Sequence, residues 1–451
     1  MRTGIQRLFA LIVLTAFAST VAAKEIGISK PERQGYSSER LAKITEFMNA
    51  KVDDGTMVGG MGVVMRNGKI IYQQTYGQAD REAGRPMEDD AIYRIYSMSK
   101  PITGVALMML YEDGKFRLND PIAMYMPEFA DLKVATSTAG TNIVSDGTTS
   151  RTVGSGDDSL VGEWRKPTRQ PTIRDLLRHT AGMTYGVFGN TEVDQLYRKA
   201  GLLGDMTLAE FTKALGQLPL QYDPGSQWHY SVSVDVQGRL VEVLSGMSFG
   251  EFLKQRIFAP LDMRDTDFQV NEDNKDRLAQ MYKPMGVDAN NFFSPATGKG
   301  LEVADAFASA RYIYGGKFES GGGGLISTAR DYLRFSQMLL NGGELDGVRI
   351  LSPKTIQLMT TNHLGELPMG FGGRGAGFGL GFGVVLNPGD VGEVSSAGEY
   401  NWGGAAGTRF WIDPEEQLIG LFMVQSLPHR TRLADDFKVL TYSAMTERQS
   451  N

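Results

Sequence analysis

The sequence predicts an α+β fold. In this fold an antiparallel sheet is built from both chain ends and flanked by terminal helices, and it carries a large, mainly helical inserted region. Three observations support this. Strand segments with turn signals lie near both ends, within 62–72 and 408–425. Helical patterns dominate the chain between them, and one more lies outside each strand pair. Because strands distant in sequence can pair while helices cover the sheet, one layered domain accounts for this order.

The first 23 residues have the pattern of a signal peptide. Arg2 and Arg7 precede an apolar run over 8–18, and small residues follow up to Ala23. The run is shorter than the roughly 20 apolar residues of a membrane-spanning helix, and no later stretch approaches that length. We therefore expect an exported protein, periplasmic or secreted, with residues 1–23 removed and no stable membrane insertion.

The mature chain is predicted to open with a helix and a hairpin. Ser37 can cap a helix over 37–48, whose apolar residues share one face. Strands over 62–66 and 69–72 flank Asn67-Gly68, and this dipeptide is the strongest short signal for a two-residue β-turn. The N-terminal part of the sheet is therefore expected to begin here.

The middle of the chain is predicted to be mainly helical. Its apolar patterns predict four helices, over 100–113, 173–179, 234–244 and 329–340. A polar stretch over 136–158 is rich in Ser, Thr and Gly, and we interpret it as a long surface loop.

Strands return near the C-terminus. Segments 408–412 and 418–425 lie on either side of the turn 413–416 and predict a second hairpin, and a final helix is expected over 432–445. We expect one integrated domain, made of a sheet region (24–95 with 370–451) and a mainly helical region (96–369).

Composition excludes several classes of function. The chain has 451 residues and a formal net charge of −6, so no basic surface for nucleic acid is expected. It has no cysteine and four histidines, which excludes thiolate metal sites, disulfides and a cysteine nucleophile. We expect no metal, no cofactor and no nucleic-acid partner, and the oligomeric state is left open.

A serine and a lysine one helical turn apart are the first candidates for chemistry. Ser97 and Lys100 open a predicted helix, and positions i and i+3 share a helix face. A desolvated lysine amine can activate a serine, and N–H groups at a helix N-terminus favour a developing oxyanion. The spacing alone is weak, because a capping serine followed by a solvated lysine satisfies it equally well.

Two further segments add to this pair. Tyr230–Val232 leads directly into a predicted helix, and Trp402–Ala405 precedes a predicted strand. With Ser97 and Lys100, this order of motifs resembles the serine β-lactamase and penicillin-binding protein superfamily. More narrowly it resembles the family VIII carboxylesterases and related transesterases, which are similar to class C β-lactamases in fold. The likeness extends over about 37–440 and includes the segments 173–182 and 321–329, both typical of that group.

The resemblance implies a role for each motif. Ser97 would be the acylated nucleophile, and Lys100 and Tyr230 would share its proton as a hydrogen-bonded base pair. Tyr230 would then return the proton to the leaving alcohol. The backbone N–H groups of Ser97 and Ala405 would form the oxyanion hole. The substrate would be bound by the segment just before Ala405, namely Trp402, Gly403 and Gly404.

Two positions depart from the β-lactamase pattern. β-Lactamases and cell-wall peptidases commonly carry Lys-Thr-Gly where this chain has 402–404, and a tryptophan cannot replace a lysine that anchors a substrate carboxylate. Their tyrosine motif commonly ends in Asn, which can hydrogen-bond a substrate amide, whereas Val232 cannot. Both changes favour a neutral ester over an anionic β-lactam. Arg374 could supply another cation or be a solvated loop residue.

Ser248 is an alternative nucleophile. Residues 246–250 match the Gly-x-Ser-x-Gly elbow of α/β-hydrolases, and His363 and His429 follow. The elbow requires a strand before the serine, whereas the preceding segment is predicted to be helical. Ser248 and Glu251 also fit a capping box. We therefore interpret Ser248 as a helix cap.

The sequence thus predicts a serine esterase that hydrolyses a small-molecule carboxylic ester through an acyl-enzyme on Ser97. Two enzymatic alternatives stay open: a transesterase that passes the acyl group to an alcohol, and a β-lactamase or D-amino-acid peptidase. The alternative outside enzymes is a catalytically idle relative that acts as a binding or scaffold protein.

Overall fold

The structure is a computed structural model that describes residues 24–136, 164–288, 294–304, 307–371 and 373–449. The predicted signal peptide, 1–23, and all but the first residue of the predicted loop 136–158 lie outside these residues and stay predictions. No helix within the described ranges is long and apolar enough to cross a bilayer.

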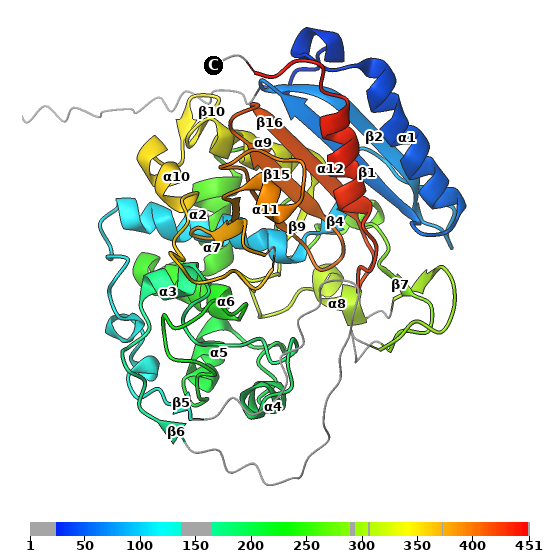
Figure 1. The fold of residues 1–451 in the computed structure, drawn as a ribbon. Coiled ribbons are helices and arrows are strands. Elements are labelled where there is room, and N and C mark those ends of the chain that lie inside the picture. The colour runs from blue at the N-terminus through cyan, green and yellow to red at the C-terminus, as the bar shows by residue number, and fades with distance from the viewer. Residues whose placement is uncertain (1–23, 137–163, 289–293, 305–306, 372, 450–451) are drawn as a thin grey trace, which may run out of the picture.

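One eight-stranded antiparallel sheet takes its strands from both parts of the chain that were predicted to form it (Figure 1). In order across the sheet, the strands are β12 (Ala376–Phe378), β13 (Gly383–Val385), β14 (Tyr400–Gly403), β15 (Arg409–Asp413), β16 (Leu418–Val424), β1 (Gly59–Arg66), β2 (Lys69–Asp80) and β3 (Arg85–Pro86). The two halves meet where β16 pairs with β1, with Val63 opposite Leu421. The predicted α+β fold and both predicted hairpins are confirmed.

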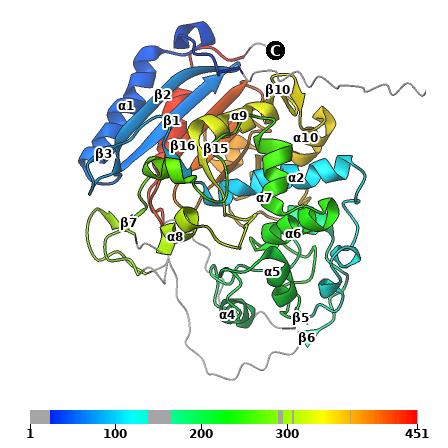
Figure 2. The ribbon, with the colours of Figure 1, turned by 180° about the vertical axis from the view of Figure 1, so that it is seen from behind.

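The terminal helices cover one face of this sheet (Figures 1 and 2). The helices α1 (Ser38–Asp53) and α12 (Leu433–Ser443) share a core with alternate residues of the strands, among them Val64. The α12 helix lies so close to β1 that a Cβ on Gly62 would be 2.5 Å from the ring of Phe437. Both terminal helices were predicted, although α1 continues five residues beyond its predicted end.

Helices of the middle region cover the other face. The helix α9 (Ala329–Leu340) packs against β15 and β16, and side chains such as Val63 join its core. The helix α2 (Ser99–Glu112) is buried on all sides from its first residue to Leu110, because its sequence is apolar all round. It packs against α6 (Ser233–Ser245), so the centre of the molecule is helix on helix.

Shorter helices complete the middle region. They are α3 (Ile173–Leu177), α4 (Glu192–Lys199), α5 (Leu208–Leu215), α7 (Phe249–Leu253), α8 (Phe307–Tyr314) and α10 (Pro353–Met359), and α11 (Pro388–Val391) follows between β13 and β14. Capping boxes begin three of them, at Thr172, Thr191 and Thr207. The mainly helical character that was predicted for this region is therefore confirmed.

A two-stranded pairing places the segment that precedes Ser97. The strand β4 (Ile92–Arg94) pairs with β9 (Ile326–Thr328), which leads directly into α9. The glycine-rich turn 320–325 precedes β9, and Leu325 accepts a hydrogen bond from the N–H of Ile95 (3.1 Å). This turn and the candidate nucleophile are therefore neighbours, although more than 200 residues separate them.

The start of the described chain is tied to α9. The guanidinium of Arg334, which is buried, donates to the Lys24 carbonyl (2.8 Å) and to Asp346 Oδ2 (2.7 Å). The backbone N–H of Lys24 donates to the same Asp346 oxygen (3.2 Å). Asp346 lies in the turn between β10 (Glu344–Leu345) and β11 (Val348–Arg349), so one carboxylate joins three segments.

Candidate active site

Ser97 lies in the turn that leads into α2. A single 3₁₀ turn (Tyr96–Met98) connects β4 with this helix. Tyr96 has a φ of +42°, a conformation that is costly for a residue with a bulky side chain. The N–H of Ile95 donates to Leu325, and the N–H of Met98 donates back to Ile95. These bonds hold the strained turn and place Ser97 at the N-terminus of a buried helix.

Lys100 meets Ser97 within the first turn of α2. Its side chain is 1% exposed. Its Nζ donates to Ser97 Oγ (3.0 Å) and to the carbonyl of Gly322 (2.5 Å). The same nitrogen lies 4.6 Å from the ring centroid of Tyr230 and 5.3 Å from that of Tyr185. Aromatic faces attract a desolvated ammonium, so the amine is held between a hydroxyl, a carbonyl and two rings.

Tyr230 reaches the same serine from another element. It lies in the extended segment just before α6, and its hydroxyl is 2.8 Å from Ser97 Oγ. The indole Nε1 of Trp402, on β14, is 3.4 Å from the Tyr230 oxygen. The structure therefore brings Ser97, Lys100 and Tyr230 together around one hydroxyl, as their predicted roles require. The roles themselves stay predictions.

Aromatic side chains enclose the Tyr230 ring on several sides. Six rings have centroids between 4.9 and 6.0 Å from it, those of His179, Tyr185, Phe188, Trp228, Phe371 and Trp402. Phe371 is the most solvent-exposed of the six, with 37% of its surface accessible. These rings pack against the Tyr230 ring and so help to hold its hydroxyl towards Ser97.

His179 supports the Tyr230 segment. Its Nδ1 accepts a hydrogen bond from the N–H of Ser231 (3.3 Å), and its carbonyl accepts one from His229 (2.8 Å). Burial, and then the nearby charge of Lys100, lower the pKa of His179 well below its usual value, so the ring stays neutral at pH 7. This histidine therefore holds the extended segment that carries Tyr230.

The candidate oxyanion turn lies against the nucleophile turn. A Cβ on Gly404 would be 2.5 Å from the carbonyl oxygen of Ile95, two residues before Ser97. The N–H of Gly404 donates to Thr408 (2.7 Å), and Ala405 is exposed at the tip between β14 and β15. The location suits the predicted pairing of the Ser97 and Ala405 N–H groups, and that pairing stays a prediction.

Two residues that depart from the β-lactamase pattern are buried. Trp402 is 8% exposed with its indole against Tyr230, and Val232 is fully buried at the N-cap of α6. Neither can present a charge or an amide to a ligand. Gly403, which ends β14, and Gly404 are half-buried beside Trp402, and Arg374 is exposed three residues after Phe371.

Sequence reasoning missed two groups at this site. One is the Gly322 carbonyl that binds Lys100, because a backbone oxygen leaves no mark in a sequence. The other is Asp235 on the first turn of α6, whose Oδ1 accepts from the N–H of Gly322 (3.0 Å). A lone acid between Val234 and Val236 at the start of a buried helix was a signal that could have found it.

Ser248 does not form a nucleophile elbow. It follows α6 rather than a strand, and it is the N-cap of α7, where its Oγ accepts from the N–H of Glu251 (3.2 Å). Glu251 Oε1 binds Gln255 (3.0 Å). The interpretation of Ser248 as a helix cap is therefore confirmed, although the reciprocal bond of a capping box is not among the contacts of the described Glu251.

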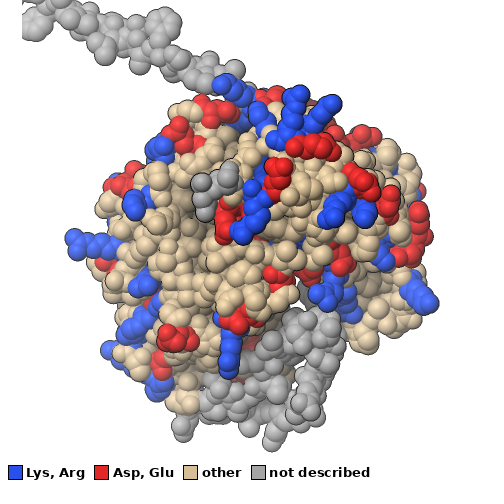
Figure 3. Space-filling model, turned by 45° about the horizontal axis from the view of Figure 1, so that its top comes forward, with Lys and Arg blue, Asp and Glu red and all other residues tan. Residues whose placement is uncertain are grey.

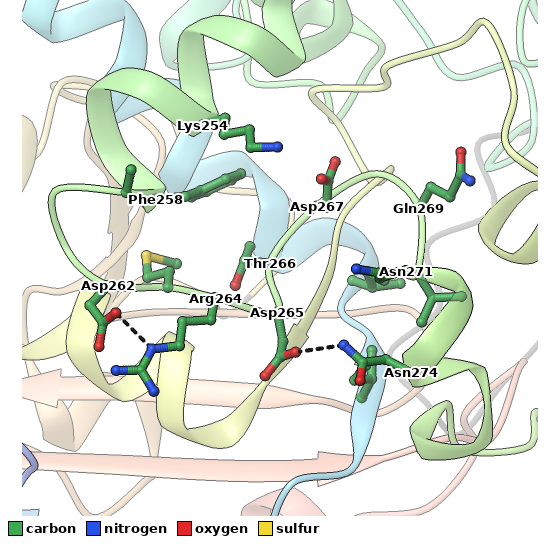
Figure 4. Close-up of a pocket in the computed structure, with 15 residues that line it drawn as sticks. Lys254, Phe258, Asp262, Arg264, Asp265, Thr266, Asp267, Gln269, Asn271 and Asn274 are labelled. Carbon is green, nitrogen blue, oxygen red and sulfur yellow. Dashed lines mark hydrogen bonds and ion pairs between the residues drawn. The ribbon is translucent and has the colours of Figure 1, made fainter.

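A polar cavity of about 430 Å³ lies elsewhere, beyond the end of α7, and none of the predicted site residues lines it (Figure 4). Some of the polar groups that line it bind one another. Asp262 pairs with Arg264 (2.7 Å), and Asp265 accepts from Asn274 (3.4 Å).

The face of the molecule in Figure 3 carries acidic and basic side chains intermixed, with no large patch of one charge.

Comparison with known proteins decides the family. The β-lactamase family model matches residues 44–442. The chain belongs to the β-lactamase family. Esterase EstB of Burkholderia gladioli is 30% identical over 381 residues, which are 82% of this chain and 87% of that protein. The lovastatin esterase of Penicillium rubens is 26% identical over 411 residues, 86% of this chain and 94% of the relative.

Solved structures agree with this membership. EstCE1, described as a hydrolase with promiscuous acyltransferase activity, superimposes with a TM-score of 0.70 at 25% identity, covering 91% of this chain and 99% of its own. Simvastatin synthase of Aspergillus terreus superimposes with a TM-score of 0.71 at 21% identity, over 91% and 98%, and shows the same fold. This β-lactamase-family protein is a serine hydrolase.

Proposed function

We propose that this β-lactamase-family protein is a carboxylesterase that works through an acyl-enzyme on Ser97. One observation carries the proposal: Ser97 Oγ lies 3.0 Å from Lys100 Nζ and 2.8 Å from the Tyr230 hydroxyl. Two proton-carrying groups thus contact one candidate nucleophile at the N-terminus of a buried helix. This is the arrangement that acyl transfer to a serine needs.

In the first half-reaction, Ser97 Oγ attacks the ester carbonyl carbon while its proton passes to the Lys100–Tyr230 pair. The carbonyl oxygen becomes an oxyanion, which the N–H groups of Ser97 and Ala405 stabilise. Collapse breaks the bond to the alkoxy oxygen, which leaves as the alcohol with the proton from Tyr230. Water then repeats the sequence on the acyl-enzyme, which releases the carboxylic acid and restores Ser97.

The preference for a neutral ester rests on buried positions. Trp402 and Val232 stand where β-lactamases and cell-wall peptidases commonly carry a lysine and an asparagine, and both are buried. A substrate carboxylate therefore lacks one charge-assisted bond, typically worth about 1.5–3 kcal/mol. The acyl amide of a β-lactam lacks a second partner. The names of the two esterase relatives support the same choice.

Kinetics with one enzyme preparation test the proposal. We expect kcat/KM for p-nitrophenyl butyrate to exceed that for a chromogenic cephalosporin by several orders of magnitude. Ser97→Ala should abolish both activities and prevent the mass increase that a fluorophosphonate gives the wild type. Ser248→Ala, the matched control, should label and turn over normally, with a stability loss of about 1 kcal/mol from the missing cap. A kcat/KM for the cephalosporin equal to that for the ester would contradict the proposal and favour a β-lactamase.

Acyl transfer is a second candidate, favoured by the likeness to EstCE1 with its printed acyltransferase activity. A transesterase shares the acyl-enzyme and differs only in the acceptor. Adding butanol to the p-nitrophenyl butyrate assay separates the two. Formation of butyl butyrate in excess of butyric acid would show that an alcohol, rather than water, is the preferred acceptor.

A further inference from the structure

Asp235 is a buried carboxylate that the mechanism above does not use. It lies on the first turn of α6, five residues after Tyr230, and it is fully buried. Its Oδ1 accepts from the Ser320 hydroxyl (2.5 Å) and from the Gly322 N–H (3.0 Å). Its Oδ2 has no hydrogen-bond partner in the described structure. Burial raises the pKa of Asp235. A half-satisfied buried carboxyl is costly, so its presence calls for a compensating role.

The turn that Asp235 binds is clamped between two helices. From the α2 side, Thr103 Oγ1 donates to the Gly321 carbonyl (2.9 Å) and Lys100 Nζ donates to the Gly322 carbonyl (2.5 Å). From the α6 side, Asp235 holds the N–H of the same Gly322. The N–H and the carbonyl of Gly322 belong to two peptide planes that meet at one Cα, so bonds to both groups together limit the φ and ψ of this residue.

Only glycine fits at the centre of this clamp. A Cβ on Gly322 would lie 2.7 Å from the Tyr185 hydroxyl and 2.9 Å from Asp235 Oδ2, closer than carbon and oxygen approach without a bond. The missing side chain lets Asp235 come close to the backbone on one side while the carbonyl reaches the buried amine. Three hydrogen bonds therefore connect Asp235 with Ser97. Asp235 binds the Gly322 N–H, the Gly322 carbonyl binds Lys100, and Lys100 binds Ser97.

We propose that Asp235 is a positioning residue for the catalytic base: it fixes Gly322 so that its carbonyl holds the Lys100 amine on Ser97 Oγ. The inference rests on the proposed function, in which Lys100 and Tyr230 take the serine proton. Asp235 acts through the backbone and touches neither substrate nor the reacting atoms. The acceptor oxygen is what matters in this role, and the carboxylate charge is not required.

Two substitutions separate the acceptor from the charge. Asp235→Ala removes the acceptor, and we expect kcat for p-nitrophenyl butyrate to fall 10- to 100-fold with KM changed less than threefold. Asp235→Asn keeps an oxygen for the Gly322 N–H and the Ser320 hydroxyl, and it should restore kcat to within about threefold of the wild type. The rate of Ser97 labelling by a fluorophosphonate should follow kcat in both variants.

Asp331 supplies a matched control. It is also a fully buried carboxylate on the first turn of a helix, α9, and it also binds one N–H and one hydroxyl, those of Asp265 (2.8 Å) and Thr266 (3.0 Å). It differs from Asp235 in that its Oδ1 also pairs with Arg330 (3.3 Å). Burial raises its pKa as well. Asp331→Ala should lower Tm about as much as Asp235→Ala while kcat stays within threefold of the wild type. General destabilisation would affect both variants alike.

Three outcomes would overturn the inference. These are an Asp235→Ala enzyme that is folded and keeps kcat, an Asp235→Asn enzyme that loses as much activity as the alanine variant, or an Asp331→Ala enzyme that loses the same. Where Asp235→Ala does not fold, Ser320→Ala replaces it. That variant removes the donor that orients Oδ1 towards the Gly322 N–H. We expect its kcat to fall at least threefold, and an unchanged kcat would contradict the role.

Failure of the proposed function is distinguishable from failure of this inference. A wild type that is labelled at Ser97 but hydrolyses no ester contradicts the esterase assignment, and the labelling rates of the variants still report on Asp235. A wild type that hydrolyses ester, with an Asp235→Ala variant equally active, contradicts only the positioning role.

Discussion

At the scale of single residues, the buried Lys100 amine shows how the site is built. A lysine removed from water needs compensation for lost hydration. Here a serine hydroxyl, one backbone carbonyl and the faces of two tyrosine rings provide it. None of these four contacts is with a carboxylate, so no direct ion pair ties the amine in place. A carboxylate bonded directly to Nζ would have held the proton in place.

Lys100 and Tyr230 should behave as one unit, because both contact the same Ser97 oxygen. Lys100→Ala and Tyr230→Phe should each lower the rate of acylation by several orders of magnitude, and the double variant should be only slightly slower than either. Residues that act together are non-additive in this way. Rapid-quench measurement of acylation with p-nitrophenyl butyrate gives the rates. Losses that multiply would show that the two residues act independently.

At the scale of elements, local signals predicted the parts of the fold that local chemistry determines. Asn67-Gly68 correctly predicted the β1–β2 hairpin, and Ser37 correctly predicted the cap of α1. The helices α4 and α5 were not predicted, although capping boxes at Thr191 and Thr207 were readable in the sequence. The β4–β9 pairing was missed because three-residue strands are too short to show a period.

The site was predictable only where its residues share an element or a family motif. The i, i+3 spacing of Ser97 and Lys100 placed both on one turn, whereas Tyr230 could be added only through the resemblance. The contacts of Gly322 and Asp235 could not be predicted from the sequence. They join α2, α6 and a glycine-rich turn across 222 and 87 residues of sequence, and no local pattern encodes such a closure.

The turn between β14 and β15 offers a test at this scale. Gly404→Ala would put a Cβ 2.5 Å from the backbone oxygen of Ile95, so the turn that carries Ala405 must move away from Ser97. We expect kcat to fall at least tenfold, since a displaced N–H donor no longer reaches the oxyanion, with a folded protein by circular dichroism. Gly389→Ala, whose Cβ would come no closer than 3.3 Å to the Asn387 side chain, is the control. Equal kcat in both variants would contradict a role for this turn.

At the scale of the whole molecule, buried histidines make stability depend on pH, and His429 is one example. Burial lowers the pKa of His429 to about 4, against roughly 6.5 in an unfolded chain. Between these values the unfolded state binds a proton that the folded state does not, so stability falls as pH falls through that window. From pH 7 to pH 4 this amounts to about 2–3 kcal/mol.

The variant His429→Asn lacks this titration. Urea unfolding at pH 7, 5 and 4 should therefore show the stability of the wild type declining towards that of the variant. The ring packs on Gly407 and binds Thr431 (2.9 Å), so the variant is expected to be the less stable protein at pH 7. Parallel pH profiles for the two proteins would contradict the assignment.

The anchoring of Lys24 has a consequence for maturation. Cleavage after Ala23, where the signal peptide is expected to end, would turn the Lys24 peptide N–H into an α-ammonium at the point where it already meets Asp346 Oδ2. The processed chain would gain an ion pair that its precursor cannot form, worth about 1 kcal/mol at a partly exposed site. Acetylating the α-amino group of a 24–451 chain should remove this gain in the free energy of unfolding. In an Asp346→Asn variant, acetylation should leave the free energy of unfolding unchanged. Proteolytic processing would then leave the enzyme more stable than the precursor from which it is cut.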